Sequence, residues 1–123
     1  MTVSYPREKK YMDKIVIEGG KRLEGEVEIS GAKNAALPIM AAMILTTGKN
    51  NLSGVPQVRD ATTMLNLLND LGGCTEEFNA GRIIFDSTGI NSFEAPYDLV
   101  STMRASCLVL GPLLARLGRA KVS

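Results

Sequence analysis

The chain changes from a strand pattern to a helix pattern within one stretch, Ser30-Gly31-Ala32-Lys33-Asn34-Ala35-Ala36-Leu37-Pro38. Proline lacks a backbone N–H and clashes inside a helix, so it is tolerated mainly in the first turn. Pro38 therefore predicts a helix that begins near Asn34. The free N–H groups and the dipole of a helix N-terminus favour anions, and Lys33 adds a positive charge there. The stretch fits a small phosphate or carboxylate site, and it also fits an ordinary capped helix with one exposed lysine.

Composition narrows the classes of function open to this chain. Its 123 residues suit about one domain, and 45% hydrophobic residues are enough for a core. A net charge of +1, 5% aromatic residues and no tryptophan give no basis for a nucleic-acid interface. There is no histidine, and Cys74 and Cys107 match no metal spacing, so we expect no metal site. Both cysteines are interpreted as small hydrophobic residues rather than nucleophiles.

The sequence shows no secretory signal and no membrane-spanning run. Its start is polar and charged, and the longest apolar run, residues 37–45, is too short to cross a bilayer. We therefore expect a soluble, cytoplasmic protein that does not contact a membrane. Residues 1–13 are expected to form a disordered leader.

Hydrophobic periodicity predicts an α/β protein with two-stranded interludes. Residues 14–18 and 23–29 predict a hairpin, whose second strand carries Glu24, Glu26 and Glu28 on a solvated face. After it we expect a buried helix over 34–45, a strand over 51–55 and a helix that is capped by Asp60 and stopped by Gly72-Gly73. A hairpin of 74–78 with 82–86 follows. The last elements expected are a helix capped by Asp98, with the apolar stripe Leu99, Met103, Cys107 and Leu110, a break at Gly111-Pro112 with a short helix beyond it, and a strand from Ala120. The order helix–strand–helix–hairpin fits one unit of a larger repeat.

Two further features are open to a functional interpretation. Arg104 lies at the edge of the predicted apolar stripe, where an arginine either covers the core with its stem or clamps an anion with its guanidinium group. Ser30 and Lys33 fit the S-x-x-K pattern of penicillin-binding enzymes, in which the serine is the nucleophile. The partner motifs S-D-N and K-T-G are absent from the sequence, which argues against a serine acyl-enzyme.

Two long motifs resemble the UDP-N-acetylglucosamine enolpyruvyl transferase family. The first is residues 30–38, and the second is residues 95–100 followed by 102–106, in the same order and at about the same distance. The resemblance covers residues 12–123. The related shikimate-pathway transferases share the fold but usually have serine where this chain has Asn34.

The resemblance implies a fold of two domains built from repeated α/β units, the EPSP synthase-like inside-out α/β barrel, of which this chain holds a part. Residues 14–30 are then a hairpin that belongs with the far domain, and residues 31–123 are the incomplete first part of the N-terminal α/β domain. The implied activity moves the enolpyruvyl group of phosphoenolpyruvate to the 3-hydroxyl of UDP-N-acetylglucosamine, by addition and elimination, in the first committed step of peptidoglycan synthesis. The resemblance also implies that no metal or organic cofactor is required.

The resemblance also implies roles for individual residues. Lys33 would hold the phosphoenolpyruvate anion, Asn34 would contact the substrates beside it, and Arg104 would bind the nucleotide-sugar side. The family's catalytic cysteine lies beyond the last residue of this sequence, so neither Cys74 nor Cys107 inherits its role. We therefore expect no catalytic residue here, and an isolated 123-residue piece that is inactive without the missing C-terminal part of the enzyme. The alternative is a non-catalytic relative that self-associates or binds a small anion.

Overall fold

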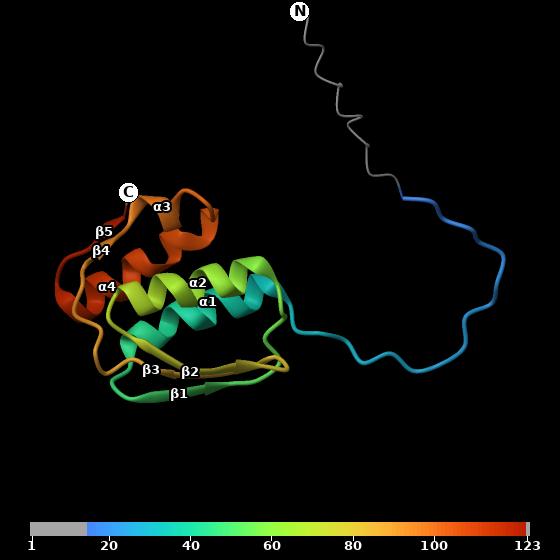
Figure 1. The fold of residues 1–123 in the computed structure, drawn as a ribbon, viewed down its shortest axis with the longest axis horizontal. Coiled ribbons are helices and arrows are strands. Elements are labelled where there is room, and N and C mark those ends of the chain that lie inside the picture. Colours follow the sequence, from blue (N-terminus) through green and yellow to red (C-terminus); the bar gives the residue numbers. More distant parts are fainter. Residues whose placement is uncertain (1–14, 123) are drawn as a thin grey trace, which may run out of the picture.

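The computed structural model describes residues 15–122, so the leader predicted over residues 1–13 lies outside the described part. Figure 1 shows three layers: a sheet, the helices α1 and α2 across one face of it, and the C-terminal helices beyond them. α2 contacts both the sheet and the C-terminal layer, while α1 contacts the C-terminal layer through the turn η2. This arrangement confirms the predicted mixture of helices and strands.

The helix predicted after Ser30 is present. α1 spans Lys33–Ala42 and continues as the 3₁₀ turn η1, Met43–Leu45. It begins just before the predicted start, so Pro38 lies in the second turn and not in the first. Because proline has no N–H, the carbonyl of Asn34 lacks its usual helical donor four residues on.

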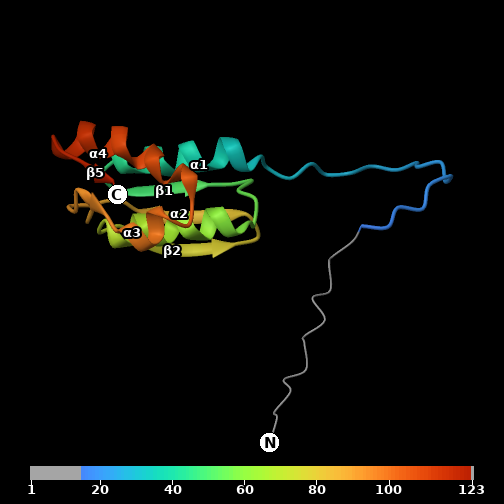
Figure 2. The same cartoon turned by 90° about the horizontal axis from the view of Figure 1, so that it is seen from above.

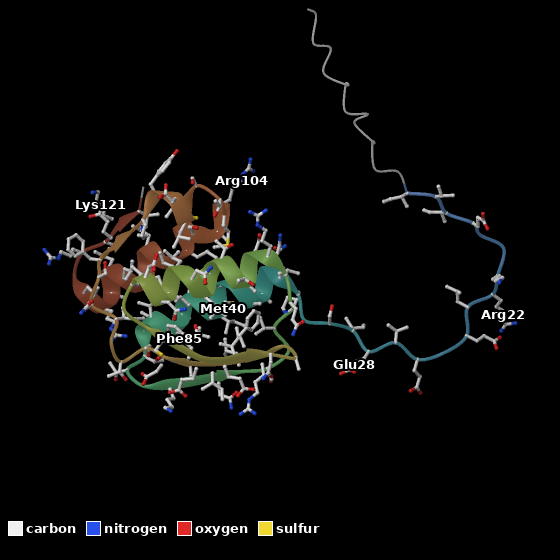
Figure 3. All side chains as sticks on the ribbon, in the orientation of Figure 1. Arg22, Glu28, Met40, Phe85, Arg104 and Lys121 are labelled. Carbon is white, nitrogen blue, oxygen red and sulfur yellow. The ribbon has the colours of Figure 1, made fainter. Side chains whose placement is uncertain are left out.

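α1 is buried on one face only, although its composition predicts a helix that is buried nearly all round. Ile39, for instance, is 52% exposed. The buried residues of α1 are Ala36, Leu37, Met40 and Ala41. Met40 of α1 and Phe85 of the sheet are both fully buried, and Figure 3 shows them on the side where the helices face the sheet. The other side of the helix is left open toward solvent.

The three-stranded sheet has the order β1-β3-β2, and both pairings are antiparallel. β1 spans Lys49–Leu52 and starts slightly earlier than predicted, while β2 (Cys74–Asn79) and β3 (Arg82–Asp86) form the predicted hairpin. Ala80 and Gly81 connect them with φ values of 42° and 76°. Two positive φ values in succession are typical of the tight turns that suit the twist of a hairpin.

α2 spans Arg59–Asp70 and has the predicted apolar face. Its buried residues are Ala61, Met64, Leu65, Leu67 and Leu68. Gly72 ends it with a φ of 107°, as predicted. Asp60, however, is the second residue of the helix and not its cap, because the extended residue before the first turn is Val58. The carboxylate of Asp60 is therefore available for another partner.

The C-terminal third differs most from the prediction. In place of a helix that breaks at Gly111-Pro112 and a short helix beyond the break, it holds α3 (Tyr97–Val100), the 3₁₀ segment η2 (Arg104–Val109) and α4 (Leu110–Leu117). Asp98 is the second residue of α3, behind Pro96, and is not its cap. The chain is extended at Met103, with φ −144° and ψ 114°, which interrupts the predicted helix within the second motif.

This interruption also changes which side chains are buried. Cys107 and Leu110, which the predicted stripe places inside, are exposed, whereas Val109 and Leu113 are fully buried. A 3₁₀ segment has three residues per turn, fewer than an α-helix. Residues that would share the buried face of an α-helix therefore do not all face the core here. The pair Gly111-Pro112 lies in the first turn of α4 and so begins a helix instead of breaking one.

The two short strands β4 (Glu94–Ala95) and β5 (Lys121–Val122) pair in parallel, which confirms the strand predicted from Ala120. Figure 2 shows α4 over α1 and α3 over α2, in agreement with the contacts of α4 with η1 and of α3 with α2. No helix within residues 15–122 has the length and hydropathy that crossing a membrane requires.

The hairpin predicted over residues 14–30 is not formed. Residues 15–30 contain no strand and run away from the three layers (Figures 1 and 2). An isolated two-stranded hairpin is marginally stable in water, and residues 15–30 are all exposed. The predicted association of this segment with a far domain stays a prediction.

Candidate functional site

Two helices begin at the same end of the molecule. α1 and α2 lie side by side with their N-termini together (Figure 1), and Lys33 Nζ is 2.9 Å from Asp60 Oδ2 across the two first turns. Figure 3 shows Arg104 at this end as well, carried there by the extended link between α3 and η2. Three segments far apart in sequence therefore meet at one place.

A cavity of about 320 Å³, here called the helix-end pocket, opens where they meet. It contains all three residues that the sequence singles out for substrate binding, Lys33, Asn34 and Arg104. The full lining is Lys33, Asn34, Leu37, Asp60, Thr102, Met103, Arg104 and Ala105. The predicted site residues are thus brought together by the fold, although this does not test their roles.

The electrostatics of the pocket favour an anion. Ala32 supplies no side-chain cap to α1, and the first N–H groups of a helix have no partner within it. The carboxylate of Asp60 balances one of the two cationic side chains, Lys33. Within the part of the chain that the structure describes, the guanidinium group of Arg104 forms no ion pair, and the first turn of α1 holds no acidic residue. One positive charge and the N-terminus of α1 therefore remain uncompensated.

Gly31 sets the position of the first turn of α1. A Cβ placed on Gly31 would lie 1.7 Å from the carbonyl oxygen of Gly54, so only glycine allows the chain to pass here. This contact brings the start of α1 against the loop that leads from β1 into α2. Gly31 therefore helps to hold Lys33 opposite Asp60.

A second cavity of about 370 Å³ adjoins the helix-end pocket. The two share Asn34, Leu37, Arg104 and Ala105. The second is mostly apolar, because Pro38, Cys107 and Leu108 complete its wall. A ligand larger than a small anion would find room to extend along this side of α1.

Both cysteines are exposed, which corrects their interpretation as small hydrophobic residues in the interior. The Sγ of Cys107 lies 3.2 Å from the carbonyl oxygen of Arg104, to which it donates, and Cys74 opens the edge strand β2. Within residues 15–122, no group of three histidine, cysteine, aspartate or glutamate residues is arranged to hold a metal ion.

The alternative of a serine acyl-enzyme finds no geometric support. Ser30 lines a different cavity, of about 410 Å³, together with Glu28 and residues of the β1–α2 loop. The ammonium group of Lys33 is turned instead to Asp60 in the helix-end pocket. A lysine that activates a serine must lie within hydrogen-bond reach of it.

Asp60 is a charged residue of the helix-end pocket for which the sequence predicted no role in the site. The sequence predicted a local role for it, as the cap of the second helix, and the structure gives it a long-range partner instead. The sequence around either residue does not predict this ion pair, because Lys33 and Asp60 belong to different helices. The resemblance covers this region too, through Val55-Pro56 ahead of Asp60, but it assigns Asp60 no role.

Known proteins resemble most of this chain. Residues 17–123 match the family profile described as EPSP synthase (3-phosphoshikimate 1-carboxyvinyltransferase). The chain is 54% identical over 112 residues to the UDP-N-acetylglucosamine 1-carboxyvinyltransferase of Geobacter metallireducens, and 55% identical over 113 residues to that of Trichlorobacter lovleyi. Each match covers 91% of this chain but only 27% and 26% of those relatives, so the chain spans about a quarter of their length.

A solved structure supports the fold. The enolpyruvyl transferase NikO from Streptomyces tendae superposes with a TM-score of 0.69 at 25% sequence identity. The superposition covers 81% of this chain and 23% of that chain. The predicted EPSP synthase-like fold, held in part, is therefore confirmed.

Proposed function

Because the chain belongs to the EPSP synthase family, we propose that it forms the substrate-binding N-terminal part of an enolpyruvyl transferase with UDP-N-acetylglucosamine as acceptor. One observation carries this proposal: Lys33, Asn34 and Arg104, from two distant segments, line one pocket at the start of two helices. The relatives at 52–55% identity support the choice of acceptor, since their names specify it. Such an enzyme acts in cytoplasmic peptidoglycan synthesis.

In this reaction the residues of the helix-end pocket would neutralise the charges of the substrates and orient them. The sugar 3-hydroxyl loses its proton as its oxygen adds to C2 of phosphoenolpyruvate, and a proton is added at C3, which becomes a methyl group. Elimination then removes a proton from that methyl group and breaks the bond from C2 to the phosphate oxygen, which releases inorganic phosphate. Lys33 neutralises the phosphate or carboxylate of phosphoenolpyruvate, and the first turn of α1 adds its dipole. Arg104 presents a fork of donors that suits the diphosphate of the nucleotide sugar. Asn34 offers both a donor and an acceptor between them.

The test uses a chimeric transferase, in which this chain replaces the matching 112 residues of the Geobacter metallireducens enzyme. Lys33→Ala should lower kcat/KM for phosphoenolpyruvate about 10- to 100-fold, as expected for a lost hydrogen bond between charged groups. Arg104→Ala should raise KM for UDP-N-acetylglucosamine by about tenfold on the same physical ground. Phosphate release with both substrates gives the rates.

The control is Lys49→Ala, which removes an exposed lysine of β1 outside the pocket. It should leave both constants within about twofold, since a surface charge contributes little. Turnover by the chimera that is insensitive to Lys33→Ala and Arg104→Ala would contradict the assignment of the pocket. The 123-residue chain by itself is expected to release no phosphate.

One observation favours the alternative of a non-catalytic chain that self-associates. Six apolar side chains of residues 15–29 are 69–93% exposed: Ile15, Val16, Ile17, Leu23, Val27 and Ile29. Exposed apolar runs of this kind are typical of interaction surfaces. Binding of phosphoenolpyruvate without turnover by the chimera would favour this alternative over the transferase.

A further inference from the structure

The helix-end pocket contains an acid that opposes its proposed ligand. The carboxylate of Asp60 lines the pocket beside Asn34 and Arg104, and it is paired to Lys33 at 2.9 Å. The two side chains are 49% and 34% exposed, for Lys33 and Asp60 respectively, so neither is fully screened by water. The negative charge of Asp60 repels phosphoenolpyruvate. We therefore expect a role of Asp60 that offsets this unfavourable effect on binding.

Helix stabilisation does not account for the contact. Asp60 is the second residue of α2, where a negative charge interacts favourably with the helix dipole. Asp98 occupies the same position in α3 and lies outside the helix-end pocket. The dipole thus explains why an acid is found at that position, but it does not explain why the Asp60 carboxylate meets Lys33.

We propose that Asp60 is a positioning residue, which fixes the Lys33 ammonium group at the pocket wall so that the enolpyruvyl donor meets a charge already in place. This inference rests on the proposed function. An ammonium group has three donors on a flexible four-carbon stem. One donor to Asp60 restrains the stem and leaves two donors for the oxygens of the ligand. Asp60 can therefore stay paired while the anion binds.

Removing the charge of Asp60 has two opposite effects on binding and a single effect on rate. Asp60→Asn keeps the shape of the side chain, removes the repulsion toward the anion and loosens Lys33. The first change favours binding and the second weakens it, so KM for phosphoenolpyruvate should change less than threefold. The rate depends on orientation, for which a misplacement of about 1 Å costs up to about 100-fold. We expect kcat to fall about 10- to 100-fold.

The experiment compares Asp60→Asn, Asp60→Glu and the matched control Asp98→Asn in the chimeric transferase. Asp60→Glu retains the charge and should recover most of kcat, while Asp98→Asn should retain all of it. A kcat that is unchanged in Asp60→Asn, or lowered equally by both asparagine variants, would overturn the proposal. So would a KM that rises in step with the fall of kcat/KM while kcat stays constant.

A second readout separates this proposal from the proposed function. Side-chain ¹⁵N spectra of the lysine ammonium groups are recorded on the 123-residue chain, with Lys33→Arg used to assign the Lys33 signal. Asp60→Asn should move that signal toward the position of freely exposed lysines, and Asp98→Asn should not. A chimera without turnover would count against the transferase, whereas a Lys33 signal that ignores Asp60→Asn would overturn the positioning role.

Discussion

At the scale of single residues, the effect of local hydrogen bonds on a pKa is clearest at Asp86, at the end of β3. The side-chain and backbone hydrogen bonds from Thr88 lower the pKa of the Asp86 carboxyl below its ordinary value of 3.8. The backbone N–H of Thr88 donates to Oδ1 at 2.8 Å. A lowered pKa in the folded state gives stability that is complete above the ordinary value and is lost as pH falls through the folded one.

Thr88→Val should raise the pKa of Asp86 toward 3.8, because it removes the side-chain donor and keeps the backbone N–H. The measurement is a carboxyl ¹³C titration between about pH 2 and 6, the range in which aspartates titrate. Thr62→Val, on the exposed side of α2, is the control and should leave the titration of Asp86 unchanged. An unaltered pKa in Thr88→Val would show that the hydroxyl does not reach the carboxylate.

The residues of the candidate site were predicted well where a sequence motif contains them. They were predicted poorly where the role of a residue depends on a partner that is distant in the sequence. Lys33, Asn34 and Arg104 were singled out from the sequence, and the structure places all three in one pocket. Asp60 was predicted as a cap because aspartate is a favourable cap type. Its pairing with Lys33 depends on how α1 and α2 pack, and local preference carries no information about that.

At the scale of elements, the accuracy of the prediction follows the clarity of the periodicity. α2 and the β2–β3 hairpin were predicted closely, because one has a clean apolar face and the other a turn with glycine. The segment 97–117 was predicted as a long helix with a break at Gly111-Pro112. Its true interruption comes before Arg104, where no glycine or proline marks it.

The contact between Gly31 and Gly54 makes a prediction about the start of α1. Gly31→Ala puts a methyl group against the Gly54 carbonyl, so backbone must move, and overpacking of this kind costs about 1–3 kcal/mol. Thermal unfolding should show a lower Tm, and the Lys33 ammonium signal should shift because Lys33 follows two residues later. Gly111→Ala in α4 meets nothing within 4 Å and serves as the control. Equal Tm values for the two variants would refute the role of this contact.

At the scale of the whole molecule, a compact α/β body carries an exposed segment. Residues 15–30 leave the body at Gly31, and their large apolar side chains face solvent. The alternation along residues 23–29 predicts a strand, and the structure shows no strand there. A strand needs a partner to satisfy its backbone groups, and a sequence pattern cannot say where that partner is.

This exposure predicts that the 123-residue chain self-associates. Sedimentation velocity should show species that grow with concentration, because burial of apolar surface favours association. The double variant Ile17→Glu with Val27→Glu should shift the distribution toward the monomer. Leu114→Glu, on an exposed position of α4, is the matched change on the body and should have the smaller effect. A sharp monomer at all concentrations would contradict the prediction.

The exposed thiol of Cys107 has a practical consequence. It lies on the wall of the cavity that adjoins the helix-end pocket, and its sulfur contacts the carbonyl of Arg104. Once Cys74 is replaced by serine, a fluorophore attached at Cys107 becomes a reporter beside the candidate site. Occupancy of the pocket could then be followed optically, in real time and without waiting for catalysis.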